Sequence, residues 1–156
     1  MSAKMALSVR DVVVRAGFVP DSNGRPHYIV NVVEDITERK KAEEKLRNIV
    51  EGSSIPTFVI TETHTISHWN AALEALTGLS KSALIGTAKQ WTAFYPRSGR
   101  YVLADLIADR APERDVKALY GDTCKKSSLI DGAYEAEDFF PAMGAEGTWL
   151  FFTAAP

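Results

Sequence analysis

The sequence predicts an α+β fold in which short helices cover one side of an antiparallel sheet of about five strands. Short apolar runs rich in β-branched and aromatic residues, bounded by Gly, Pro, Asn and Asp, recur near both ends of the chain. Between them lie segments whose apolar residues recur at helical spacing. Strands followed by helices and then by strands are typical of an α+β domain. A strand hairpin and a charged helix are predicted before this domain.

The N-terminal hairpin is predicted from two Val-rich runs, residues 5–15 and 27–34. Residues 18–26 lie between them and contain Asn23-Gly24, a typical turn dipeptide. A two-stranded hairpin is marginally stable alone in water. We therefore expect it to dock on another sheet.

The charged segment 38–52 is predicted to form a helix that follows a break at Asp35-Ile36-Thr37, with Thr37 as its cap. Its apolar positions are spaced four and three apart, which is the spacing of a short coiled-coil seam: Ala42, Leu46 and Ile49. Three such positions also fit an ordinary solvated helix, because a coiled coil is normally identified from three to four heptads.

The elements of the remaining chain follow from apolar spacing and from Gly, Pro and Asn punctuation. In order they are strands at 57–61 and 65–69, a helix at 71–77 between the N-cap Asn70 and the stop Gly78, a helical turn at Leu84-Ile85, an irregular aromatic stretch at 87–100, an amphipathic helix at 100–110, a short helix with Val116 and Leu119, and strands at 132–140 and 148–153.

Composition limits the possible functions and locations. The net charge of −2 gives no basic footprint for nucleic acid. No apolar run approaches the ~20 residues of a membrane span, and the first residues lack the apolar region of a signal peptide. The single cysteine, Cys124, excludes an intrachain disulfide and suits a reducing compartment. We expect a cytoplasmic protein.

From Ile55 to Pro156 the chain resembles a PAS domain, a sensory fold of bacterial signalling proteins. The resemblance is carried by IPTFVI, by HWN, by NAALEALTGLSKSALIG, by EDFFP and by WLFFTAAP. Residues 27–37, HYIVNVVEDIT, resemble the last strand of a PAS domain with its Asp-Ile-Thr ending, and ERKKAEEKL resembles the linker helix that follows. The expected division is therefore 1–37, the terminal strands of a PAS domain; 38–52, a linker helix; and 53–156, a PAS domain.

The resemblance implies a five-stranded sheet, yet only four strands are predicted between Ile55 and Pro156. Two interpretations follow. Either the chain spans the end of one PAS domain and most of the next, or the hairpin supplies the missing strand, within the chain or exchanged between two chains. An unpaired, apolar strand at 148–153 would promote aggregation. We therefore expect the hairpin to pair with that strand, preferably across a homodimer.

A ligand pocket between helices and sheet is a further implication of the resemblance. The residues expected to line it are Trp91, Tyr95, Tyr120, Tyr134 and Glu135. The alternative is that these aromatic side chains only fill the core. Other acidic residues near Glu135 are expected to be solvated.

No metal site is expected, and the cofactor is left unknown. His64 and His68 are four residues apart, without the His-x-x-His or Cys-x-x-Cys spacing of a metal site, and are expected to be a turn and a sheet histidine. Haem-binding relatives use a histidine on the long helix, and residues 97–119 contain none. Cys124 lacks the neighbours of the flavin-reactive cysteine. Haem and flavin are therefore disfavoured.

The expected function is that of a sensory and dimerisation module that couples a small-molecule or protein cue to the coiled-coil linker helix. A haem- or flavin-loaded gas or redox sensor and a free-standing small enzyme are the alternatives. Because no catalytic motif occurs in the chain, we expect no enzyme activity here. A histidine kinase or cyclase output domain would then lie elsewhere in the parent protein.

Overall fold

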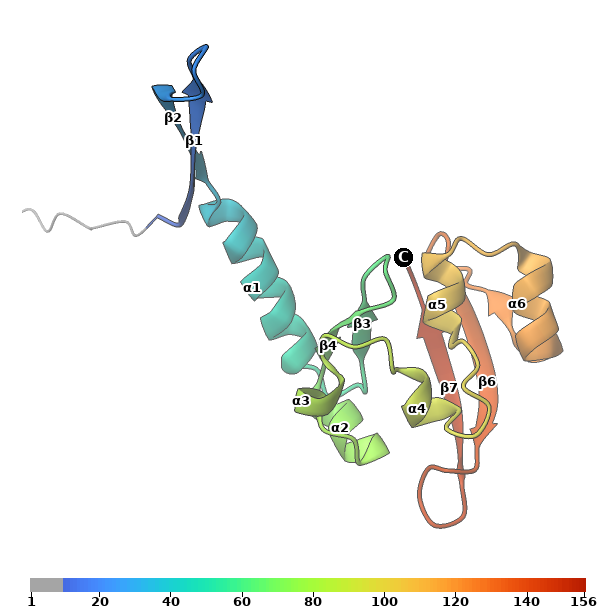
Figure 1. Ribbon diagram of the computed structural model, residues 1–156. Coiled ribbons are helices and arrows are strands. Elements are labelled where there is room, and N and C mark those ends of the chain that lie inside the picture. The colour runs from blue at the N-terminus through green and yellow to red at the C-terminus, as the bar shows by residue number, and fades with distance from the viewer. Residues whose placement is uncertain (1–9) are drawn as a thin grey trace, which may run out of the picture. The chain divides into compact units, whose positions relative to one another are not determined.

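The computed structural model of the protein describes residues 10–156, without the side chains of Pro26 and His27. The chain divides into two compact units between Asn48 and Ile49, inside a helix. Each unit is described by itself. Helices and antiparallel strands together confirm the predicted α+β class (Figure 1). The part of the predicted first strand before residue 10 lies outside the described residues.

The first unit contains a hairpin of two antiparallel strands, β1 (Val12–Pro20) and β2 (Pro26–Asp35). The predicted turn at residues 18–26 is too long, because Asp21 makes a tighter one. Its carboxylate accepts hydrogen bonds from the backbone N–H groups of Asn23 and Arg25, at 2.8 and 2.9 Å. The first strand therefore continues to Pro20.

The helix α1 (Thr37–Glu51) follows β2 directly. The Asp35 carboxylate accepts a hydrogen bond from the Thr37 backbone N–H at 3.0 Å. The Thr37 side chain is the main cause that lowers the pKa of Asp35, and the bond from the Thr37 backbone adds to it. The Thr37 hydroxyl instead accepts from the Asp11 N–H at 2.9 Å. The predicted cap at Thr37 is thus wrong: Asp35 serves the first N–H of the helix, and Ile36 between them is buried.

The second unit begins with a small sheet and ends with a larger one. Its elements are β3 (Phe58–Ile60), β4 (Ile66–Trp69), α2 (Ala71–Thr77), α3 (Lys81–Leu84), α4 (Trp91–Phe94), α5 (Leu103–Ala108), α6 (Glu113–Tyr120), η1 (Gly121–Thr123), β5 (Lys125–Lys126), β6 (Tyr134–Phe140) and β7 (Thr148–Ala154). Strand β3 pairs with β4, and β6 pairs with β5 and β7, all antiparallel.

Five strands, rather than the predicted four, thus lie between Ile55 and Pro156. The additional one is β5, two exposed lysines that pair with Tyr134 and Glu135. A two-residue strand has no periodicity from which it could be predicted. Within the part of the chain that the structure describes, β3 has β4 as its only strand partner, and β7 has only β6.

Two helices differ from their predicted extents. The helix α5 covers only part of the predicted residues 100–110, because Arg110 has a positive φ of 51° and because the Asp105 carboxylate caps the Val102 N–H at 2.9 Å. The helix α4 occupies a stretch predicted to be irregular. The helix α2 agrees with the prediction, including its N-cap Asn70 and its C-cap Gly78, whose φ is 71°.

Two hydrophobic clusters form the core of the second unit. One packs β4 against α2 and α3, and its buried members are Ile66, Trp69, Leu73, Leu84 and Ala93. The other packs α5 and α6 against β6, and its buried members are Leu103, Leu106, Val116, Tyr120, Cys124 and Ala136. Among the described residues, no helix is long and apolar enough to cross a membrane.

Candidate functional site

The side chain of Asn70 joins four segments of the second unit. It is fully buried. Its Oδ1 accepts hydrogen bonds from the backbone N–H groups of Thr57 and Leu73, at 3.0 and 2.9 Å. Its Nδ2 donates to three carbonyl oxygens, at 3.1, 3.2 and 2.8 Å respectively: those of Val50, Ser53 and Ile55. One amide therefore holds the last turn of α1, the following loop, the start of β3 and the start of α2.

Further contacts hold the last turn of α1 in place. Val50 is the one buried residue of this helix. The Glu51 carboxylate pairs with the Lys81 ammonium at 3.0 Å, and the Lys81 backbone N–H donates to the Glu74 carboxylate at 2.7 Å. The end of α1 is thereby tied to α2 and α3 as well as to Asn70.

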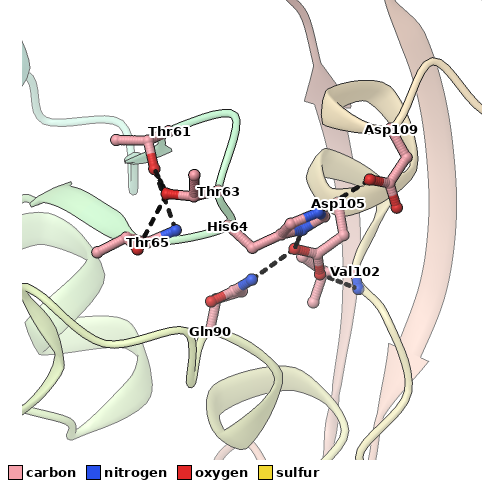
Figure 2. A network of polar contacts seen from close by, with 8 residues as sticks. All are labelled: Thr61, Thr63, His64, Thr65, Gln90, Val102, Asp105 and Asp109. Atoms are coloured by element: carbon pink, nitrogen blue, oxygen red, sulfur yellow. Dashed lines mark hydrogen bonds and ion pairs between the residues drawn. The ribbon is translucent and has the colours of Figure 1, made fainter.

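A second polar network links the β3–β4 turn to α5 (Figure 2). His64 lies in this turn with a positive φ of 61°. Its Nδ1 lies 2.7 Å from Asp105 Oδ1, and its Nε2 lies 3.0 Å from Asp109 Oδ1. Asp105 is buried, and its carboxylate also accepts hydrogen bonds from the Gln90 amide and the Val102 N–H.

This network favours a protonated His64. The hydrogen bond that His64 donates to Asp105 is the main cause that raises the pKa of His64, and Asp109 adds to it against the opposing effect of burial. The Tyr101 ring stacks on the imidazole with a centroid distance of 5.5 Å. A charged His64 can donate to both carboxylates at once, whereas the neutral ring can donate only to one. The turn and α5 are thus fastened most strongly when His64 is charged.

A cavity of about 970 Å³ lies beside β3, β7 and α5. Its lining is mostly apolar and includes Thr57–Glu62 of the β3 segment, Val102–Ala104 at the start of α5, and Leu150–Ala154 of β7. Ile55, Thr57 and Leu73 also line it, and each of these contributes a backbone group to Asn70. An occupant of this cavity would therefore contact residues bonded directly to Asn70.

A third cluster surrounds Arg100. Its guanidinium carbon lies 3.8 Å from the centroid of the Tyr95 ring and 4.9 Å from that of Tyr120. It also forms an ion pair with Asp138 at 2.7 Å, and the Tyr95 hydroxyl donates to the same carboxylate at 3.0 Å. Burial is the main cause that raises the pKa of both tyrosines. Both hydroxyls therefore stay protonated donors at neutral pH.

Only two of the five residues predicted to line a pocket lie at the cavity. Tyr95 and Tyr120 line the cavity, whereas Trp91, Tyr134 and Glu135 are absent from its lining. Glu135 pairs with Lys125 of β5 and Thr153 of β7. The predicted linker residues Ala42, Leu46 and Ile49 are all exposed. A role for these residues in ligand binding or in dimerisation remains a prediction.

The sequence predicts Asn70 only as a helix cap, and its contacts to α1 are not predicted. The contacts of His64 with α5 are not predicted either. His68, the other histidine considered, lies in β4, and its Nδ1 contacts the Ser67 hydroxyl at 3.0 Å. Asp138, expected to be solvated, is instead half-buried and paired with Arg100. Within the described part of the chain, no group of three or more His, Cys, Asp or Glu is arranged to hold a metal ion.

Cys124 is expected to react slowly with thiol reagents. It is buried, 3% exposed, and this burial raises the pKa of its thiol. Reaction then requires local opening, so we expect modification by dithionitrobenzoate roughly 100-fold or more slower in the native protein than in urea. Native and unfolded rates that agree within about tenfold would show an accessible thiol instead.

Residues 44–88 match the family model of the PAS fold. The matched stretch includes the end of α1, both strands of the first small sheet, and helices α2 and α3, with Asn70 near its middle. The match supports a PAS domain and so confirms the predicted resemblance. No curated protein matches the sequence.

Proposed function

We propose, because residues 44–88 match the PAS fold, that the chain is a sensory and dimerisation module of a bacterial signal-transduction protein. In this proposal a change in the second unit passes to helix α1 through Asn70. The observation that carries the proposal is the Asn70 side chain itself, whose hydrogen bonds join the last turn of α1 to the start of β3 and of α2.

The mechanism depends on the rigidity of this connection. A buried amide that loses a partner leaves a polar group unsatisfied, at roughly 1–3 kcal/mol per group. A displacement of Thr57 or Leu73 therefore costs less free energy when Asn70 moves with it and the hydrogen bond is kept. The carbonyl of Val50, which accepts from Asn70, then moves as well. Such coupled elements shift between discrete packings rather than bending continuously.

The cue is proposed to be a small apolar molecule or a protein segment that occupies the part of the cavity lined by β3 and α5. The lining is largely apolar, and the Tyr95 and Tyr120 hydroxyls supply polar groups near it. The proposal assigns no reaction and no cofactor to this chain. A histidine kinase or cyclase elsewhere in the parent protein would receive the signal, in the cytoplasm.

Hydrogen exchange with indole as the probe tests the coupling. We expect indole to slow exchange in peptides that contain residues 57–62, which line the cavity, and also in peptides that contain residues 48–53. In the variant Asn70→Ser the first effect should persist and the second should be lost, because serine retains a cap oxygen but lacks the amide donor. Bound indole that leaves residues 48–53 of the unsubstituted protein unchanged would contradict the proposal.

A further inference from the structure

The strand β7 has one open edge. Its residues Thr148–Ala154 pair with β6, and among the described residues no strand pairs with the other edge. Residues Leu150–Ala154 also line the cavity, so this stretch borders on open space rather than packed side chains. Side chains on the two faces alternate, with Trp149 and Phe151 70% and 64% exposed. A long apolar strand with an unpaired edge readily binds another strand.

The β1–β2 hairpin has the complementary property. Strand β2 pairs with β1, and no second strand partner occurs in the described residues. Its centre is apolar on both faces, and its exposed side chains include Ile29, Val30, Val32 and Val33, at 75, 47, 55 and 64% exposure. A two-stranded ribbon with both faces in water is marginal by itself.

We propose that β2 of a second copy of this chain pairs with the open edge of β7, so that two copies exchange their hairpins. This inference rests on the proposed dimerisation module and names the surface by which it dimerises. In each copy the order becomes β5, β6, β7, then β2 and β1 of the partner subunit. Strand β2 keeps β1 on its other edge, so the exchange breaks no pairing that the chain already has.

The choice of β2 over β1 follows from the residues. The middle of β1 holds Arg15 and Gly17, and a charge or a glycine on a strand disfavours pairing at its edge. The middle of β2 is Ile29–Val33 with Asn31 as its one polar residue. Ten residues of β2 also exceed the seven of β7, so the whole open edge can be paired.

The size of the contact suits a second copy. A hairpin whose longer strand has ten residues is about 33 Å long and about 10 Å wide, so one face presents about 330 Å² in projection. If one face of each exchanged hairpin also packs on the partner, the two hairpins and the two surfaces under them bury about 1,300 Å², which is within the range of specific interfaces. A reciprocal exchange also closes with two-fold symmetry, as most dimers do.

Disulfide cross-linking of the full chain tests the pairing. Val32→Cys is combined in turn with Phe151→Cys and with Thr153→Cys, because strand pairing brings facing Cβ atoms within disulfide reach at one register or the next. The natural Cys124 is buried and stays out of the reaction. Light and isotope-labelled chains are mixed while unfolded and reduced, refolded together and then oxidised, and the linked products are weighed.

We expect a linked dimer that contains one light and one heavy chain in about half of the molecules, as random pairing requires. A link within one chain would overturn the proposal in favour of docking in the same chain. The absence of a link in both combinations would overturn it altogether.

Light scattering provides an independent test. The double variant Val30→Lys, Val32→Lys is expected to convert a dimer to a monomer, because two charges then enter the paired face. Since both side chains are exposed in the single chain, the fold of the second unit should be retained, as read from its near-ultraviolet circular dichroism. A dimer that persists in this variant contradicts hairpin exchange.

The matched control is the double variant Leu46→Lys, Ile49→Lys, which places two charges on the exposed α1 seam. The single variant Leu46→Lys places one charge there. If either of these variants alone produces monomers, the dimer forms through the helix and the exchange is overturned. The Asn70 coupling is read separately by hydrogen exchange, so either proposal can fail while the other stands.

Discussion

Replacing Asn70 with alanine is expected to lower the free energy of unfolding of the second unit by about 3 kcal/mol or more. Loss of the N-cap contributes about 1 kcal/mol. The Leu73 N–H and the carbonyls of Val50 and Ile55 keep other hydrogen bonds. The Thr57 N–H and the Ser53 carbonyl lose their bond to the amide, at roughly 1–3 kcal/mol each where water cannot replace it. Urea unfolding followed by tryptophan fluorescence measures the change, because Trp69 is buried next to Asn70 in the chain.

One further variant separates the roles of the amide oxygen and nitrogen of Asn70, and a second variant serves as a control. Asn70→Asp keeps the oxygen that caps α2 but replaces the donor with a second acceptor, which faces three carbonyls. We therefore expect a loss similar to that of alanine. Asn48→Ala, the same change at an exposed position of α1, should alter the free energy of unfolding by less than about 0.5 kcal/mol. If Asn70→Ala behaved like Asn48→Ala, the junction would carry no stability.

The contribution of His64 to stability is expected to depend on pH. Its pKa is raised in the folded protein, so its contribution is fully present below the unfolded pKa of about 6.5 and is lost as pH rises through the folded pKa. The unsubstituted protein should therefore exceed His64→Gln in free energy of unfolding by about 1–3 kcal/mol near pH 6, and by less at pH 9. Urea unfolding at the two pH values measures both differences.

His68→Gln is the control for this experiment. Its imidazole contacts the Ser67 hydroxyl rather than a carboxylate, so His68→Gln removes a histidine without breaking an ion pair. An equal effect of His64→Gln at both pH values would mean that the ion pairs with Asp105 and Asp109 do not stabilise the fold.

Local sequence signals predicted helices and strands well, but contacts between residues far apart in the sequence were not predicted. Asn70 before an apolar helix and Gly78 after it are sufficient to place α2. The other partners of Asn70 lie 13 to 20 residues earlier, in segments without regular structure or at a helix end. Periodicity carries no information about which loop carbonyls a buried amide will meet.

The same limit applies to His64, whose partners lie 41 and 45 residues away on α5. The sequence predicted that His64 lies in a turn and that residues 100–110 form an amphipathic helix. The structure has both elements. Only the fold brings the two together. The hairpin differs, because its two strands are neighbours in the sequence. Its apolar pattern was sufficient to predict that β1 pairs with β2.

Native-state hydrogen exchange of the full chain tests the junction at Asn70 most directly. If this side chain couples the elements, the amides of Thr57 and Leu73, which both donate to it, and those of the last turn of α1 should open with the same free energy. In Asn70→Ser the last turn of α1 should open more easily than α2. A last turn of α1 that, in the unsubstituted protein, already exchanges at least tenfold faster than Thr57 and Leu73 would contradict the account.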